Sequence, residues 1–199
     1  MTGSKSVLTL HGYSQCADTF NQKSGPIRRL LKKLGYDTVH LEAPLVIAEE
    51  VKERSWFKFK EDYSQYYEFD NAIDYVVKYL NEHPEIEGII GFSQGACLLG
   101  ALSTQLTKFP NNIKFIIVIS GFLPAAEDVK TKYYGTDKIT VPSMHIYGKE
   151  DPYIECHRSI SLAEVYQNPT CYEHPGKHFV PSNAASMKEI QSFLSTLQK

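Results

Sequence analysis

The stretch Gly91-Phe92-Ser93-Gln94-Gly95 places a serine between two glycines, each two positions away from it. This is the G-x-S-x-G spacing of a nucleophile elbow, a sharp strand-to-helix turn that exposes the serine hydroxyl at the edge of a sheet. Side chains at the flanking positions would collide in such a turn, which explains the glycines. An ordinary turn with an idle serine is the alternative, but an apolar run before the motif and a helix-like stretch after it favour the elbow.

A serine hydroxyl needs a general base, and the base needs an acid that orients it. In elbow-type hydrolases these groups follow the serine in the order acid, then histidine. The stretch MHIYGKEDPYI places Asp151 in a loop after a late strand, and CYEHPGKHFVP places His178 in a loop before the final helix. We therefore expect Ser93, Asp151 and His178 to form a catalytic triad.

Other acids and histidines stay open as alternatives. Glu150 adjoins Asp151, and Asp128 lies in the loop after the strand KFIIVIS, where some hydrolases carry their acid. His174, at the end of the last predicted strand, is the main rival to His178. The remaining histidines precede the serine or fall within predicted helices and a strand: His11, His40, His83, His145 and His157.

Acyl transfer also needs donors for the oxyanion that forms in the transition state. One donor is expected to be the backbone N–H of Gln94, directly after the nucleophile, and the other a backbone N–H from the loop after the first core strand. That loop reads LHGYSQ, which points to the N–H of Tyr13. The alternative is that His11-Gly12 forms an ordinary turn.

Strands alternating with helices must position these groups. Apolar, β-branched runs predict strands at 7–10, 38–41, 86–90, 114–120, 141–147 and 170–174. Apolar spacing of three and four predicts helices at 26–34, 69–80, 94–106 and 158–166, and a last helix after an N-cap at Ser182. This order predicts a three-layer α/β/α sandwich around a mostly parallel sheet of about six strands.

The 199 residues are expected to form a single domain, 1–199. One connection, 43–67, is longer than most in such a fold and is rich in aromatic residues. It is interpreted as a lid or pocket-wall insertion, with a packed excursion from the core as the alternative. Predicted pocket residues are Trp56 and Phe57 in this segment, with Phe122 and Phe179 in ISGF and GKHFVPS.

Composition excludes several other classes of protein. A formal net charge of −2 argues against nucleic-acid binding, which needs clustered basic residues. Four widely spaced cysteines indicate neither a zinc site nor a disulfide framework, so we expect no metal or cofactor and a reducing compartment. No signal peptide or membrane span is apparent, which predicts a cytoplasmic protein. The sequence predicts no particular oligomeric state.

Five stretches appear in order over nearly the whole chain: TLHGYSQ, GFSQGA, ISGF, VPSMHIYGKEDPYI and GKHFVPS. With them the sequence resembles the FSH serine hydrolases, small proteins related to the ovarian-cancer-associated hydrolase. The resemblance implies the minimal α/β-hydrolase fold, the Ser93–Asp151–His178 triad and an oxyanion hole at Tyr13 and Gln94. The family's Arg-x-Trp-Trp stretch reads Arg54-Ser55-Trp56-Phe57 here, a departure that concerns the substrate pocket.

The expected function is therefore that of a serine esterase that hydrolyses carboxylic esters through an acyl-enzyme. A first alternative, drawn from the resemblance, is an acyl thioesterase acting on acyl-CoA or an acyl-carrier protein. For that substrate, Lys58, Lys60 and Lys177 would supply a basic rim. A second alternative, of a different class, is a non-catalytic ligand-binding protein on a hydrolase scaffold. The expected partner in either enzyme reading is a small-molecule ester or thioester.

Overall fold

Six strands form the central sheet, and all neighbouring strands in it are parallel. The computed structural model describes residues 5–106 and 113–197. The strands lie in the order β10-β9-β8-β7-β1-β2. Their bounds are β1 Lys5–Leu10, β2 Tyr36–Leu41, β7 Ile86–Phe92, β8 Phe115–Ile119, β9 Ser143–Gly148 and β10 Thr170–His174. The predicted six-stranded, mostly parallel sheet is confirmed.

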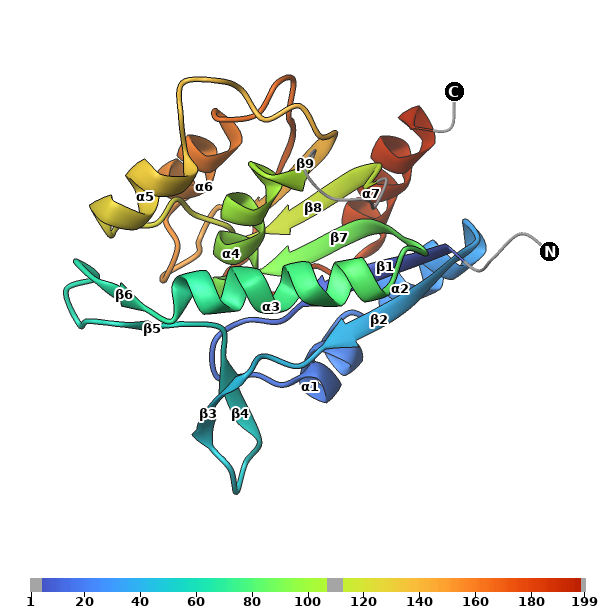
Figure 1. Ribbon diagram of the computed structural model, residues 1–199. Helices are drawn as coiled ribbons and strands as arrows, with labels where there is room; N and C mark the ends of the chain where they lie inside the picture. Colours follow the sequence, from blue (N-terminus) through green and yellow to red (C-terminus); the bar gives the residue numbers. More distant parts are fainter. Residues whose placement is uncertain (1–4, 107–112, 198–199) are drawn as a thin grey trace.

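Helices cover both faces of this sheet (Figure 1). One face packs against α3 (Phe69–Glu82), α4 (Gln94–Ser103), α5 (Glu127–Tyr133) and α6 (Cys156–Ala163). The other packs against α1 (Ala17–Lys23), α2 (Gly25–Lys33) and α7 (Ala184–Thr196). The result is the predicted three-layer sandwich. None of the helices within residues 5–106 and 113–197 has the length and apolar character needed to cross a membrane.

The strands are apolar throughout because both of their faces are buried. Successive side chains of a strand point to opposite faces, so neighbours in sequence enter different layers. In β8, Ile116 and Val118 join the cluster under α3 and α4, whereas Ile117 joins the cluster under α2 and α7. Burial on both faces explains why the central strands read as continuous apolar runs rather than as alternating ones.

The order of the strands creates a switch point between β1 and β7. From β1 the chain adds β2 on one side, and it later returns to β7 on the other side of β1. Ligands of parallel α/β sheets usually bind at such a point, beyond the carboxyl ends of the strands. The loop with Tyr13 follows β1 and the turn with Ser93 follows β7, so both lie at this position.

Two details differ from the prediction. Helices α1 and α5 were not predicted, since each has only seven residues and too few apolar positions to show a period. The N-cap of α7 is Asn183, not Ser182, because the Asn183 side chain accepts a hydrogen bond of 2.8 Å from the Ser186 N–H. After α2 the chain turns at Gly35, whose φ of 86° favours glycine.

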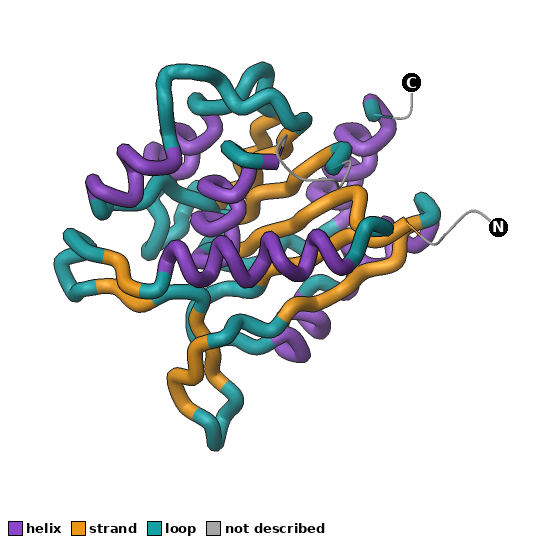
Figure 2. Tube along the Cα trace, in the orientation of Figure 1, coloured by secondary structure: helices purple, strands orange, loops and turns teal. Residues whose placement is uncertain are grey.

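Residues 43–67 form two small antiparallel hairpins. The first pairs β3 (Leu45–Ala48) with β4 (Glu53–Ser55) and projects from the body, as Figures 1 and 2 show. The second pairs β5 (Lys58–Phe59) with β6 (Tyr66–Tyr67). Between the hairpins, Trp56 and Phe57 are 0% and 1% exposed. The segment thus has exposed hairpin tips and a junction that belongs to the core.

Candidate active site

Ser93 lies in a strained turn between β7 and α4. Its φ of 53° and ψ of −113° are unfavourable for a residue with a side chain. A Cβ atom on Gly91 would lie 2.7 Å from the Cα of Ala96, and one on Gly95 would lie 2.4 Å from the carbonyl oxygen of Leu10. The two glycines are therefore required because the backbones of the helix and of β1 pass too close for a side chain.

The imidazole of His178 lies beside the Ser93 hydroxyl. Its Nε2 is 2.9 Å from Ser93 Oγ, and its Nδ1 is 2.6 Å from Oδ2 of Asp151. The ring is held by aromatic contacts with Phe92 and Tyr153, at centroid distances of 4.9 and 5.4 Å. With Nδ1 donating to the carboxylate, Nε2 is left to accept the serine proton, which is the arrangement that a general base requires.

The carboxylate of Asp151 is fully buried and is fixed by backbone donors. Its Oδ1 accepts hydrogen bonds from the N–H groups of Tyr153 and Ile154, at 2.9 and 2.8 Å. Its Oδ2 faces His178. Because both oxygens have partners, the carboxylate has one orientation, and so has the imidazole bound to it.

The loops that carry Asp151 and His178 are bonded to each other. The Lys149 N–H donates to His174 O at 2.8 Å, and the Glu150 N–H donates to Gly176 O at 3.0 Å. A Cβ on Gly148 would lie 2.5 Å from the carbonyl oxygens of both Gly176 and Lys177. Glycine at 148 thus allows the two loops to meet closely enough for the acid to reach the histidine.

The rival residues occupy other positions. Glu150 is exposed, and Asp128 lies exposed in the first turn of α5, where it borders a different hollow. His174 is buried, and its Nδ1 accepts a hydrogen bond of 3.2 Å from the Gly176 N–H. Burial lowers the pKa of His174, although the nearby carboxylates oppose this shift. Its contacts give it a role in shaping the loop that presents His178.

Both residues expected to supply oxyanion donors line the same cavity as Ser93. Leu10 at the end of β1 pairs with Gly91 of β7, so the loops that follow these strands start side by side. Within the described part of the chain, the N–H groups of Tyr13 and Gln94 donate to no protein acceptor. The neighbouring Gly12 N–H donates to Gln15 Oε1 at 3.1 Å, which holds the loop turned. Two free donors beside a serine hydroxyl suit an oxyanion.

The side chain of Gln94 has a second role that the motif did not reveal. Its Oε1 accepts a hydrogen bond of 2.9 Å from the Trp56 N–H, and its Nε2 donates to Phe57 O at 2.8 Å. Nε2 also lies 3.0 Å from Ser55 Oγ. One buried amide therefore ties the junction of residues 55–57 to the turn that carries the candidate nucleophile. Sequence periodicity could not detect this link, because it joins segments 37 to 39 positions apart.

His11 supports the same junction from the other side. Its Nδ1 lies 2.8 Å from Gly12 O, and its Nε2 accepts from the Ala43 N–H at 3.1 Å. Burial lowers the pKa of His11, while the carboxylate of Glu42 opposes the shift. The neutral ring, packed 5.3 Å from the ring of Trp56, thus braces the start and the middle of the 43–67 segment.

A cavity of about 300 Å³ opens beside Ser93 and His178. Its lining is largely aromatic and includes Tyr13, Phe57, Phe59, Tyr63, Tyr66, Ser93, Gln94, Phe122, Tyr153, Ile154, Arg158 and His178. The structure thus places the predicted pocket residues Phe57 and Phe122 in the wall. Neither Tyr153 nor Arg158 was singled out from the sequence, because a helix or loop position carries no signal of which cavity it faces.

The other two predicted pocket residues lie outside this lining. Trp56 is completely buried behind the wall, where its indole N–H donates to His11 O at 2.8 Å. Phe179 is 43% exposed and packs against the ring of His174, at a centroid distance of 4.9 Å. The expectation that they line the pocket was wrong, because Trp56 supports the wall from inside and Phe179 covers the outer side of its loop.

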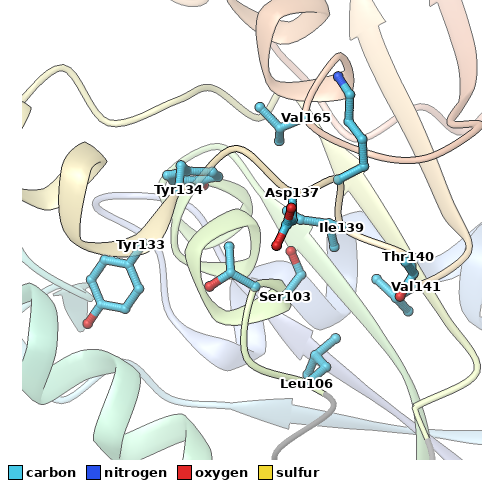
Figure 3. A pocket seen from close by; sticks show the side chains of 12 residues that line it. Ser103, Leu106, Tyr133, Tyr134, Asp137, Ile139, Thr140, Val141 and Val165 are labelled. Atoms are coloured by element: carbon cyan, nitrogen blue, oxygen red, sulfur yellow. The ribbon is translucent and has the colours of Figure 1, made fainter.

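A second cavity, of about 290 Å³, lies at the far end of α4 (Figure 3). Its walls come from Ser103, Thr104 and Leu106, from residues 133–135 and 137–141, and from Val165. Ser103 does not resemble a nucleophile, since its hydroxyl is bonded to Gly100 O and to the Tyr166 hydroxyl, both at 2.7 Å. The residues of the candidate triad do not line this cavity.

Metal and thiol chemistry find little support in the described residues. Among them no three His, Cys, Asp or Glu side chains are grouped so that they could hold a metal ion. The four cysteines are unpaired. Cys97, beneath the elbow, is fully buried, and burial raises the pKa of its thiol. That thiol is therefore kept protonated and out of reach of a substrate.

The chain is similar in sequence to known serine hydrolases and esterases, and similar in fold to solved structures. The family profile described as "Serine hydrolase (FSH1)" matches residues 1–190. An esterase of Anopheles gambiae is 34% identical over 97% of this chain and 78% of its own. Esterase OVCA2 of Danio rerio is 29% identical, with coverage of 96% and 97%. The crystal structure of Zea mays acyl-protein thioesterase 2 shares the fold with a TM-score of 0.71 and 18% identity, with coverage of 100% and 96%.

Proposed function

The chain belongs to the FSH1 family of serine hydrolases, and on that premise we propose that it hydrolyses carboxylic esters through a covalent acyl-enzyme. Membership in a hydrolytic family favours an enzyme over a non-catalytic binder. The proposal rests above all on one observation, the continuous chain of contacts from Ser93 Oγ through His178 to Asp151, with distances of 2.9 and 2.6 Å.

In the proposed reaction, Ser93 Oγ attacks the carbonyl carbon of the ester while Nε2 of His178 takes its proton. Asp151 holds the imidazole in the required tautomer and stabilises its charged form. The tetrahedral intermediate then collapses, and Nε2 returns the proton to the departing alcohol. A water molecule, deprotonated by the same nitrogen, attacks the acyl-enzyme and releases the acid.

The developing negative charge on the carbonyl oxygen would be bound by the backbone N–H groups of Tyr13 and Gln94. Removal of one such donor from an acyl-transfer site typically costs about 2.7–4 kcal/mol of transition-state stabilisation. The N-terminus of α4 adds a favourable electrostatic field at the same point, since its first N–H groups face the turn. The largely aromatic wall of the cavity lowers the local dielectric constant, which strengthens these interactions.

An active-site-directed fluorophosphonate tests this assignment. The wild type should be labelled and Ser93→Ala should not. Ser120→Ala is the matched control, because Ser120 also has a positive φ (49°) at the end of the neighbouring strand but is 0% exposed. Labelling of the control should equal that of the wild type. Equal labelling of wild type and Ser93→Ala, or no labelling of either, would refute the proposal.

Acyl thioesters are the second candidate substrates. Lys58, Lys60 and Lys177 are exposed, and each adjoins in sequence a residue that lines the cavity, so cations stand near its mouth. A basic rim suits an acidic carrier protein or the phosphates of coenzyme A. Matched oxygen and sulfur esters with the same acyl chain would distinguish the two classes. A higher kcat/KM for the thioester, which falls when these lysines are reversed in charge, would favour the thioesterase.

A further inference from the structure

The cavity beside Ser93 contains a cation that the proposed reaction does not use. Arg158 lies in α6, a few residues after the loop with Asp151, and its side chain lines the cavity. Its guanidinium carbon is 4.7 Å from the centroid of the Phe122 ring, a cation–π contact. The arginine is thus held against one wall of the pocket into which the substrate must fit.

This cation has no carboxylate partner within the described part of the chain. Arg158 forms no ion pair there, and its side chain donates no hydrogen bond to a protein acceptor. The nearest acid along the helix, Glu155, contacts His157 instead, at 3.1 Å. The lining itself contains neither aspartate nor glutamate. Among residues 5–106 and 113–197, no acidic side chain therefore pairs with the charge of Arg158.

The charge also acts on the interior of the pocket. Burial raises the pKa of Tyr66, another lining residue, and the positive charge of Arg158 opposes this rise. A guanidinium carries five N–H donors around its edge, and contact of its face with an aromatic ring leaves that edge available. In a mostly aromatic cavity, the partner that such donors fit best is a planar anion held by two parallel hydrogen bonds.

We propose that the substrates carry a carboxylate in addition to the ester that is cleaved, and that Arg158 binds this carboxylate. The inference rests on the proposed esterase function and names its substrate class, half-esters of dicarboxylic acids or esters with an acidic leaving group. Arg158 then acts as a specificity residue. It orients the substrate from a distance while Ser93 and His178 carry out the chemistry.

Matched neutral and anionic esters test the proposal. The p-nitrophenyl monoester of adipic acid is compared with the corresponding primary amide, which has the same size and no charge. For a carboxylate on the other side of the ester, the hexanoate of 3-hydroxybenzoic acid is compared with that of its amide. In at least one pair, the wild type should favour the acid by about tenfold or more in kcat/KM, as expected for a paired carboxylate. The pair that responds identifies the side that carries the charge.

Variants distinguish direct binding of the carboxylate by Arg158 from a general attraction of the anionic substrate to nearby positive charge. Arg158→Met should abolish the preference by raising KM for the acid toward or above KM for the amide. Arg158→Lys should keep only part of the preference, because it lacks the planar fork. Lys58→Met is the control, since Lys58 is exposed on the same side of the molecule and does not line the cavity. The proposal is refuted by equal rates for both members of each pair, by an unchanged preference in Arg158→Met, or by an equal loss in Lys58→Met.

A binding measurement separates this inference from the esterase proposal. The product acid of the pair that responds, adipate or 3-hydroxybenzoate, should raise the Tm of the Ser93→Ala protein by a measurable amount, and the corresponding amide should not. The shift should disappear in Ser93→Ala combined with Arg158→Met. Binding that depends on Arg158, without hydrolysis by the wild type, would support the carboxylate site and contradict the esterase. Hydrolysis of neutral esters without binding of either acid would support the esterase and overturn the carboxylate site.

Discussion

Replacement of Gln94 by alanine tests whether one buried amide holds the pocket wall to the nucleophile turn. The wild-type side chain is 3% exposed and bonds to the N–H of Trp56 and the carbonyl of Phe57. In Gln94→Ala the backbone N–H, the expected oxyanion donor, is retained. The substitution therefore removes the link to residues 55–57 without removing the donor.

The magnitude follows from the groups left behind. The Trp56 N–H loses its acceptor in a fully buried place, which costs about 1–3 kcal/mol. The Phe57 carbonyl keeps a partner, since Ser55 Oγ donates to it at 2.6 Å. The space vacated by the side chain costs about a further 1 kcal/mol. The total, about 2–4 kcal/mol of unfolding free energy, should lower Tm by roughly 4–16 °C for a chain of this length.

Thermal unfolding and ester kinetics measure the two consequences. Because Phe57 lines the cavity, the loosened wall should raise KM more than it lowers kcat. Ser55→Ala and the double variant complete a thermodynamic cycle, in which residues sharing one network should couple by about 0.5–3 kcal/mol. Gln65→Ala is the control, since Gln65 is exposed and its contact with the Tyr67 hydroxyl is at the surface. A Tm within 1–2 °C of wild type for Gln94→Ala, roughly the scatter of surface substitutions, would refute this reasoning.

Three further predictions concern the loops and the core. Asp151→Asn should keep the fold but lower kcat for ester hydrolysis by about 10⁴, because the amide favours the wrong imidazole tautomer. A decrease in kcat of less than tenfold would contradict this. Gly148→Ala should lower kcat/KM by at least about 100-fold, since the added Cβ would lie 2.5 Å from the carbonyl oxygens of Gly176 and Lys177 and displace the loop of His178. A wild-type kcat/KM would show that the two loops do not need to lie this close. Burial lowers the pKa of His145 to about 3, so the unfolded chain, with an ordinary histidine pKa near 6.5, binds the extra proton. Stability should therefore fall as pH drops below about 6.5, by roughly 2 kcal/mol at pH 5, and His145→Gln should flatten this dependence in urea titrations; parallel pH profiles would contradict it.

The distribution of apolar residues was enough to predict the sheet and most of the helices. Buried parallel strands need apolar side chains on both faces, so their sequences stand out without any knowledge of the fold. The segment 170–174 was predicted with the bounds that β10 has. The short helices α1 and α5 were not predicted because a helix of two turns shows no clear period of apolar residues. The hairpins within 43–67 escaped because their strands have only two to four residues.

The candidate triad was predictable for a different reason. In a parallel sheet all strand ends meet at one edge, so residues that follow β7, β9 and β10 must come near one another whatever lies between them. Order along the chain then selects Asp151 and His178 as partners of Ser93. The choice between His178 and His174, or between Asp151 and Glu150, depended on which side chain turns toward the serine. Loop hydrogen bonds decide that, and they have no sequence period.

The pocket was decided by the tertiary structure alone. The sequence identified an aromatic segment, but it could not tell Phe57, which lines the cavity, from its neighbour Trp56, which is buried behind it. Both residues lie in a junction that the amide of Gln94 holds through backbone hydrogen bonds across 37 and 38 positions of chain. Likewise, nothing in the sequence distinguishes Arg158 from the other basic residues, and only its position in α6 brings it against Phe122. Sequence patterns report what a residue's own strand or helix requires, whereas a pocket is made by contacts between segments far apart in the chain.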